Sequence, residues 1–198
     1  MVTLHQYLEN NKAVIELTSF EECFEIFNHS GKLSSAHYYF RGQPNSAHKL
    51  QSSLDRVGAK SKLWHEAQFI SSFKKAAMNY LPPGLTPTTT FEWLCLMQHF
   101  GVPTRLLDFT KSPYVGLYFA TSDFHEECDA SIWAINPGLL HEGASLFLKG
   151  KDFPLLIEEP HFHNFSNFIQ EPYFAEAFLS DKYRFCAVLE PAVAEKDC

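Results

Sequence analysis

The sequence predicts an α+β fold, in which a helical N-terminal half packs on a small mixed or antiparallel sheet. Three segments before residue 101 are typical of helices, and the first of them opens at a capping box and repeats apolar side chains at helical spacing. Short runs of aromatic and β-branched residues, bounded by glycine and proline turns, are spread along the chain as candidate strands. With 198 residues, 45% of them hydrophobic, the chain 1–198 is expected to form a single domain.

The helical segments are defined by their terminal residues. Ser19 and Glu22 have the form of a capping box at the start of the first segment. Gly101 stands where a left-handed residue ends a helix, and Ser112-Pro113 has the form of an N-cap followed by proline at the first helical position. The expected helices therefore open at Phe20, with Cys23, Phe24 and Phe27 on its apolar face, and span 61–80, 90–100 and 114–121. In the second helix, the apolar face is expected to carry Leu63, Ala67, Ile70, Phe73 and Ala77.

Three short runs are predicted to be strands. The first, 36–40, is expected to stop at the turn-like residues that follow, which places Arg41 at the strand end with its side chain in a cleft. The second is 130–135 and the third is 183–189, with a long loop over 143–172 between them.

Composition narrows the classes of function. A net charge of -7 argues against a protein that grips nucleic acid through many phosphates, although it leaves nucleic acid open as an acceptor held by a small local patch. The five cysteines have neither zinc-site nor redox-dithiol spacing, and His161 and His163 lack a third ligand, so no metal is expected. The sequence shows neither an apolar stretch long enough to span a membrane nor a signal sequence. This predicts a cytoplasmic protein without a membrane partner.

Two segments carry more polar chemistry than a core requires, namely Arg41-Gly42-Gln43 and the run from Gln98 to Thr110. Polar groups alternating with apolar ones are costly to bury unless each finds a partner, which favours the wall of a ligand pocket. These segments suit a phosphate-bearing small molecule, because they combine arginine guanidinium groups, a glycine turn and the helix N-terminus at Ser112. The candidate ligand-binding residues are Arg41, Gly42, Gln43, Gln98, Thr104, Arg105 and Ser112.

Structural interpretations stand beside this one. Arg105 and Asp108 would also form a buried ion pair that locks the turn, and His99 would serve as a cationic cap at the C-terminus of its helix. A hydrolase pairing His99 with Asp108 is conceivable, but the sequence offers no nucleophile at a persuasive position.

The two polar segments resemble a known family. Tyr39-Phe40-Arg41-Gly42-Gln43, followed by Met97–Thr110 and by Ser112–Ala120, is similar to the FRG domain, named for its Phe-Arg-Gly motif. Ser53-Leu54 with Arg56, Glu66 and Phe73 resembles the weaker segment between the motifs. The resemblance covers 35–137 and leaves the C-terminal part divergent or truncated. It implies a domain found widely in bacteria and their phages.

A remoter resemblance links the same residues to ADP-ribosyltransferases of the Arg-Ser-Glu type. It implies that Arg41 holds the phosphates of NAD and that Thr110 orders the site. Gln170 or Glu171, within the loosely fitting segment 168–174, would replace the usual glutamate, and Asp108 is the other candidate carboxylate. Alternatively, 185–191 is the strand before that motif and the sequence stops short of it. The candidate catalytic residues are Arg41, His99, Asp108, Thr110, Gln170 and Glu171.

Two functional hypotheses follow. One is an NAD-using ADP-ribosyltransferase or NAD glycohydrolase, acting as a toxin or defence effector. The other is a non-catalytic module that senses a phosphorylated metabolite or nucleotide, or binds a protein partner, through the same pocket. The missing glutamate favours the second, and turnover by the purified protein separates them.

Overall fold

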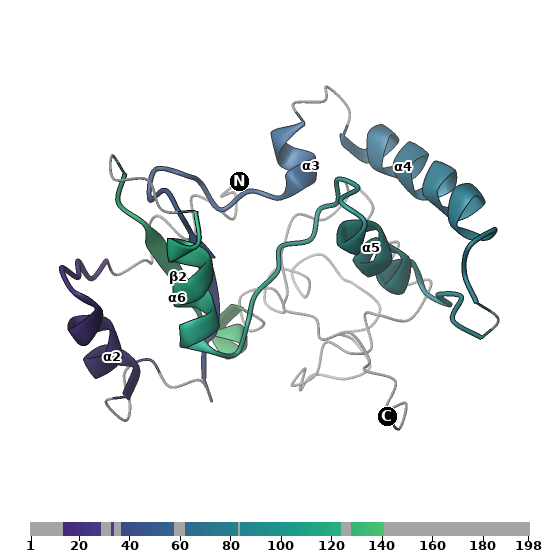
Figure 1. The fold of residues 1–198 in the computed structure, drawn as a ribbon. Coiled ribbons are helices and arrows are strands. Elements are labelled where there is room, and N and C mark those ends of the chain that lie inside the picture. The colour runs from purple at the N-terminus through teal and green to yellow at the C-terminus, as the bar shows by residue number, and fades with distance from the viewer. Residues whose placement is uncertain are drawn as a thin grey trace. The chain divides into compact units, whose positions relative to one another are not determined.

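The computed structural model describes residues 14–28, 33, 37–57, 62–82, 84–123 and 128–140 (Figure 1). These residues form an α+β fold with a small antiparallel sheet, as the sequence predicts. They belong to two compact units: the described residues up to Leu50 and from Asp108 onward form unit 1, and those of Gln51–Leu107 form unit 2. A single domain over 1–198 stays a prediction. The expected loop 143–172 and strand 183–189 lie outside the described residues.

Unit 1 contains α2 (Phe20–Asn28), β1 (Tyr39–Gln43), α6 (Pro113–Thr121) and β2 (Ser131–Ile135). Unit 2 contains α3 (Ser53–Arg56), α4 (Lys62–Ala77) and α5 (Thr90–His99). The helix predictions are confirmed within about three residues, and Gly101 has the expected positive φ of 76°. No helix in the described part of the chain is long and apolar enough to cross a membrane.

The sheet of unit 1 pairs β1 with β2 in antiparallel register, with Arg41 opposite Trp133 and Gln43 opposite Ser131. On its other edge, β1 forms an isolated bridge between Phe40 and Thr110. The prediction that the strand stops before Arg41 is wrong, since β1 continues through Gln43. Pairing with β2 holds Gly42 and Gln43 in the strand, so glycine here does not mark a turn.

Gly42 is required by the close approach of α6, which packs against one face of the sheet (Figure 1). A Cβ at residue 42 would lie 2.0 Å from the Gly116 carbonyl oxygen and 2.4 Å from the Ala120 nitrogen. The backbones of β1 and α6 therefore meet directly. Phe40, on the same side of β1, is fully buried, and its ring lies 6.2 Å from that of Phe27 in α2.

The core of unit 2 forms where α4 packs on α5. Phe91, Leu94 and Met97 are buried, and Phe69, Ile70 and Phe73 of α4 pack against them. The expectation that Ala67 faces the core is wrong, because Ala67 is exposed. The buried side chain on that part of α4 is Glu66.

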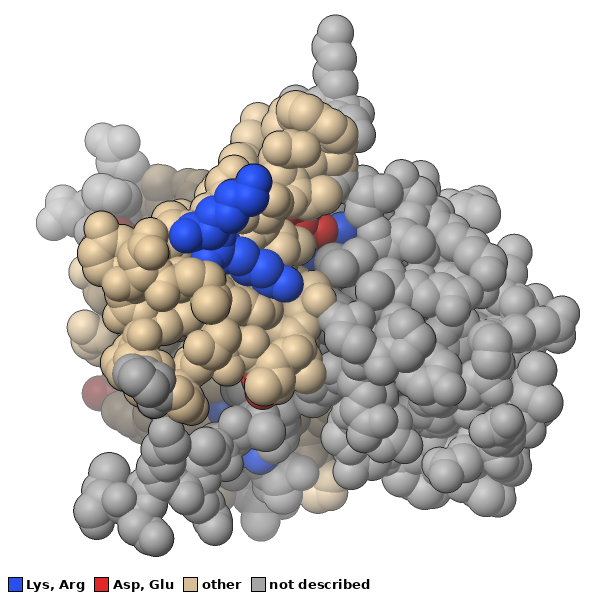
Figure 2. Space-filling view, turned by 90° about the vertical axis from the view of Figure 1, so that its right-hand side faces the viewer, with Lys and Arg blue, Asp and Glu red and all other residues tan. Residues whose placement is uncertain are grey.

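Among the described residues in Figure 2, Lys and Arg side chains lie next to one another, and most of the residues around them are uncharged. On α4, Lys74 and Lys75 occupy the last turn, where a cation is favoured by the helix dipole. The Lys74 ammonium nitrogen lies 5.3 Å from the centroid of the Trp93 ring, so α4 and α5 also meet through a cation–π contact.

A capping box begins α5. The hydroxyl of Thr89 accepts a hydrogen bond from the Glu92 backbone nitrogen, and the Glu92 carboxylate accepts from the backbone nitrogens of Thr88 and Thr89 and from the Thr88 hydroxyl. Partial burial raises the pKa of Glu92, but these donors outweigh burial and hold its pKa below the ordinary value.

We predict that Gly42→Ala destabilises the protein by about 3 kcal/mol, because the added methyl group meets backbone atoms that move only with α6. Gly116→Ala is the matched comparison: its Cβ lies 3.1 Å from the Phe40 Cβ, so a smaller loss is expected. Urea unfolding of both variants measures the difference. Equal losses, or a Gly42→Ala variant as stable as the wild type, would contradict the packing described here.

We also predict an acid-sensitive contribution from Glu92. Because its folded-state pKa is lowered, its stabilisation is fully present above the ordinary pKa of glutamate and is lost as the pH falls through the lowered value. Glu92→Gln should cost about 1 kcal/mol at neutral pH, the usual scale of a lost cap. Thermal unfolding against pH tests this: the wild type and Glu92→Gln should converge in acid, and a constant gap would refute the linkage.

Candidate functional site

Arg41 lies in the middle of β1, on the face of the sheet opposite α6. Side chains alternate along a strand, and Phe40 and Gly42 point toward α6, so Arg41 points the other way. Residues paired across an antiparallel ladder share a face. We call this set the Arg41 face; it consists of Tyr39, Arg41 and Gln43 of β1 and of Ser131, Trp133 and Ile135 of β2.

The Arg41 face combines cations with aromatic rings. Arg41 is half-buried, and its Nη1 donates a hydrogen bond of 2.8 Å to the Asp108 carbonyl oxygen. Trp133 is its cross-strand neighbour. The Lys111 ammonium nitrogen lies 5.6 Å from the centroid of the Tyr39 ring. A guanidinium fixed beside aromatic rings suits a ligand that has both phosphate and a flat ring system.

Gln43 is occupied by contacts within unit 1. Its side-chain oxygen accepts from the Trp133 indole nitrogen at 2.6 Å, and its amide nitrogen donates to the Lys49 carbonyl at 3.4 Å. The bond from the indole fixes the orientation of the Trp133 ring, and Trp133 is the residue paired with Arg41 across the ladder. The paired Ser131 has a buried hydroxyl for which the structure gives no hydrogen-bond partner.

Main-chain hydrogen bonds join the Phe-Arg-Gly segment, 40–42, to the segment 108–110 of the second motif. Phe40 N donates to Thr110 O at 2.7 Å, and Thr110 N donates to Phe40 O at 2.8 Å. Thr110 is thus on the Phe40 side of β1, where its hydroxyl accepts from Ser112 N at 3.1 Å. The Ser112 hydroxyl in turn caps α6 by accepting from Val115 N. Ser112 and Thr110 therefore build the start of α6.

In unit 2, Thr104 joins α3 to the end of α5. It is fully buried, its nitrogen donates to the Ser53 hydroxyl, and its carbonyl accepts from Leu54 N and from the Ser53 hydroxyl. Its own hydroxyl donates to the Gln98 side-chain oxygen and accepts from Leu106 N. Thr104 and Gln98, both predicted to bind ligand, thus hold the loop after α5 in place.

Arg105 pairs with Glu66 of α4. Its Nε lies 2.9 and 2.7 Å from the two carboxylate oxygens, and Nη2 also bonds the nearer one. Glu66 is only 1% exposed, whereas the Arg105 side chain is 30% exposed. The sequence interpretation of an ion pair at Arg105 proposed Asp108 as the partner; the partner described in the structure is Glu66.

The remaining candidates belong to different units or lie outside the described residues. His99 is the exposed last residue of α5 in unit 2, with its ring 5.3 Å from that of Phe100. Asp108 is exposed in unit 1. Gln170 and Glu171 lie outside the described residues. Among the residues that the structure describes, no group of three or more His, Cys, Asp or Glu side chains is arranged to hold a metal ion.

Sequence reasoning missed the contacts of three residues, although it named Glu66 in the family resemblance. Trp133 was assigned only to a buried strand, yet it stands at the position across from Arg41. Lys111 follows the second motif directly, and its proximity to Tyr39 requires the Phe40–Thr110 bridge. Glu66 did carry a signal, since it precedes Ile70 and Phe73 at helical spacing and so lies on the apolar face of α4.

Comparison with known protein families gives a match to the FRG domain. The family model of the FRG domain matches residues 36–129, somewhat less than half of the 198-residue chain. The match includes β1, the helices of unit 2 and α6. Neither a curated protein nor a solved structure matches the chain.

We predict that Arg105→Ala destabilises the protein by about 3 kcal/mol or more, because it leaves the Glu66 carboxylate buried without the guanidinium group that pairs with it. Glu66→Gln should cost less, since Arg105 is exposed enough for water to reach it. Arg56→Ala is the control, as Arg56 is exposed and its Nη1 donates to the Gln51 carbonyl rather than to a buried carboxylate. Denaturant unfolding measures all three, and Arg105→Ala matching Arg56→Ala would count against the pair.

Proposed function

With the family match supporting an FRG domain at residues 36–129, we propose that this domain binds a phosphate-bearing nucleotide on the Arg41 face, with NAD as the best candidate. One observation carries the proposal. The two motifs that resemble ADP-ribosyltransferases meet in space, because Phe40 pairs with Thr110 and Arg41 donates to the Asp108 carbonyl. Motifs about seventy residues apart thus form one local structure, as a shared site requires.

The chemistry of the Arg41 face suits the parts of NAD. Arg41 supplies a charged donor fork for the pyrophosphate, and its bond to Asp108 O fixes the orientation of the fork. Tyr39 and Trp133 offer ring surfaces for adenine or nicotinamide. Lys111, close to the Tyr39 ring, supplies a second cation for the same anion.

The reaction class we propose is cleavage of the bond between nicotinamide and ribose. Nicotinamide leaves with the bonding electron pair, and the ribosyl carbon becomes electron-poor until water or an acceptor nucleophile adds to it and loses a proton. A nearby carboxylate stabilises that developing charge. Asp108 is exposed next to the Arg41 contact and can supply it; Gln170 or Glu171 are the alternatives. Water as the nucleophile makes a glycohydrolase, and a macromolecule makes a transferase.

A non-catalytic ligand sensor is the second candidate, and the second motif favours it. Gln98, Thr104 and Arg105 all bond to partners within unit 2, so these polar groups serve the fold. Polar groups that serve the fold do not assist a reaction, which favours recognition of a nucleotide or phosphorylated metabolite without turnover.

The biological setting belongs to the same proposal. NAD consumption or ADP-ribosylation inside a bacterial cell would act as a toxin or a defence, with nucleic acid among the possible acceptors. The described cysteines, Cys23, Cys95 and Cys128, are free thiols, which supports a cytoplasmic setting.

The test is calorimetric titration of NAD and of ADP-ribose into the wild type, Arg41→Ala and Arg56→Ala. Arg56 is the matched control because its Nη1 also donates to a backbone carbonyl at 2.8 Å. We expect at least ~10-fold weaker binding in Arg41→Ala, the scale of a lost charge-assisted contact, and no change in Arg56→Ala. If the wild type does not bind NAD, or if both variants lose the same affinity, NAD is not the ligand of the Arg41 face.

Chromatographic detection of released nicotinamide then separates the two candidates. For an enzyme, Asp108→Asn should keep NAD binding and lower nicotinamide release by about 10²-fold or more. Full release by Asp108→Asn would exclude this carboxylate and direct attention to Gln170 and Glu171. Tight, Arg41-dependent binding without release would identify the sensor.

A further inference from the structure

The outward face of α6 is apolar along the whole helix. Gly116 and Ala120 pack on β1, and the four residues on the opposite side are exposed. Tyr114 and Val115 are each 41% exposed, Tyr118 is 64% exposed and Phe119 is 55% exposed. A helix of a folded protein ordinarily presents polar residues to water, so four adjacent apolar side chains indicate an interaction surface.

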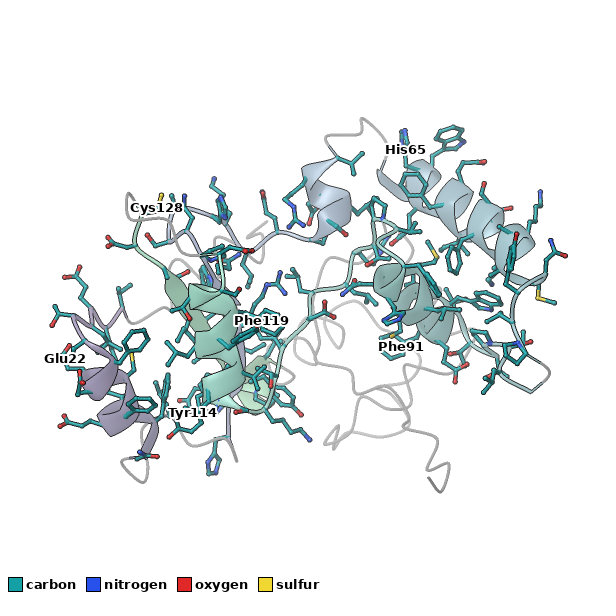
Figure 3. All side chains as sticks on the ribbon, in the orientation of Figure 1. Glu22, His65, Phe91, Tyr114, Phe119 and Cys128 are labelled. Carbon is teal, nitrogen blue, oxygen red and sulfur yellow. The ribbon has the colours of Figure 1, made fainter. Side chains whose placement is uncertain are left out.

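The apolar surface continues onto α2. The ring of Phe24 lies 5.7 Å from that of Tyr114, and the Tyr114 hydroxyl donates to the Asn28 side chain at 2.7 Å. Phe20 and Phe24 remain 56% and 44% exposed. We call this surface the aromatic patch; it consists of Phe20, Phe24, Tyr114, Val115, Tyr118 and Phe119. Figure 3 labels Tyr114 and Phe119 on α6.

Carboxylates border the aromatic patch. Glu21 and Glu25 are exposed on α2, next to Phe20 and Phe24, and Asp123 is exposed just after α6. A partner that covers the patch therefore meets negative charge at its edge, which favours basic residues in that partner.

The shape of the patch suits a helix. Tyr114 with Tyr118, and Val115 with Phe119, are i,i+4 pairs, so they form two parallel ridges with a groove between them. The ridges of a second helix pack into such a groove. Since α6 has nine residues, or about 13 Å of length, two to three turns of a partner would cover it.

We infer that the aromatic patch docks an amphipathic helix of a partner protein, whose apolar stripe packs on α6 and whose lysines or arginines face Glu21 and Glu25. An anionic membrane fits less well, because the bordering carboxylates would be repelled by its surface. The patch lies on the α6 side of the sheet and the Arg41 face on the other, so partner and nucleotide would bind independently.

The probe is a short amphipathic helical peptide of leucine and lysine, titrated into the whole chain beside a peptide in which glutamate replaces lysine. We expect the lysine peptide to bind more tightly. Tyr118→Ser with Phe119→Ser should weaken it at least about tenfold, as expected for two interface aromatics. Tyr80→Ser, which truncates an 85% exposed tyrosine of unit 2, is the control and should not change binding. Glu21→Lys with Glu25→Lys should reverse the preference between the peptides.

Other results would overturn the proposal. Equal binding of both peptides, or no binding, would rule out a basic amphipathic helix as the partner of the aromatic patch. A fall in Tm much beyond about 2 °C in Tyr118→Ser/Phe119→Ser would mean that these side chains are packed within the folded chain. A dimer by light scattering that this variant dissociates would identify a second copy as the occupant. Binding to anionic vesicles through the patch would identify a membrane.

Discussion

The closeness of α6 to β1 is the constraint on which unit 1 depends. Where the helix crosses Gly42, a Cβ would lie 2.0 Å from a helix carbonyl, so main chain packs on main chain. This contact decides which side of β1 faces inward. Phe40 and Gly42 are turned to the helix, and Arg41 is thereby turned to the opposite face beside Trp133. One glycine thus places the cation, and the outward side of the same helix carries the aromatic patch.

Unit 2 depends on polar groups that satisfy one another. Thr104 is fully buried because its nitrogen, carbonyl and hydroxyl all have partners, and Glu66 is buried because Arg105 forks onto both its oxygens. Removing Arg105 would leave the buried Glu66 carboxylate without its partner, which costs more than the bond itself contributes. The motif rich in polar residues is therefore, in this unit, largely a scaffold.

Periodicity and capping residues predicted the elements of the fold well, because these signals are local. Ser112-Pro113, Gly101 and the stripe of Leu94 and Met97 each determine their own helix end or core face. The end of β1 was mispredicted because glycine breaks a strand in most contexts, whereas Gly42 is present for a helix that follows some seventy residues later.

The site was predicted in part, for the same physical reason. Arg41, Asp108 and Thr110 belong to motifs visible in the sequence; Arg41 contacts the Asp108 carbonyl, whereas Thr110 pairs with Phe40 and lies on the opposite side of β1 from the Arg41 side chain. Trp133 was missed as a neighbour of Arg41, because strand register is a long-range property that no local pattern encodes. Arg105 was paired with the nearest carboxylate in the sequence, but α4 supplies Glu66 from 39 positions away.

The nesting of one unit within the other has a consequence for how the chain folds. The Gln43–Trp133 hydrogen bond joins residues 90 positions apart, and residues 51–107 between them build the described part of unit 2. The contacts of α4 with α5 close short loops, whereas the sheet must close a very long one at a higher entropic cost. During synthesis on a ribosome, β1 would emerge long before β2. The edge of β1 that pairs with β2 would stay unpaired until β2 has been made. We therefore expect the two-stranded sheet that positions Arg41 to form late in folding, after the helices of residues 51–107.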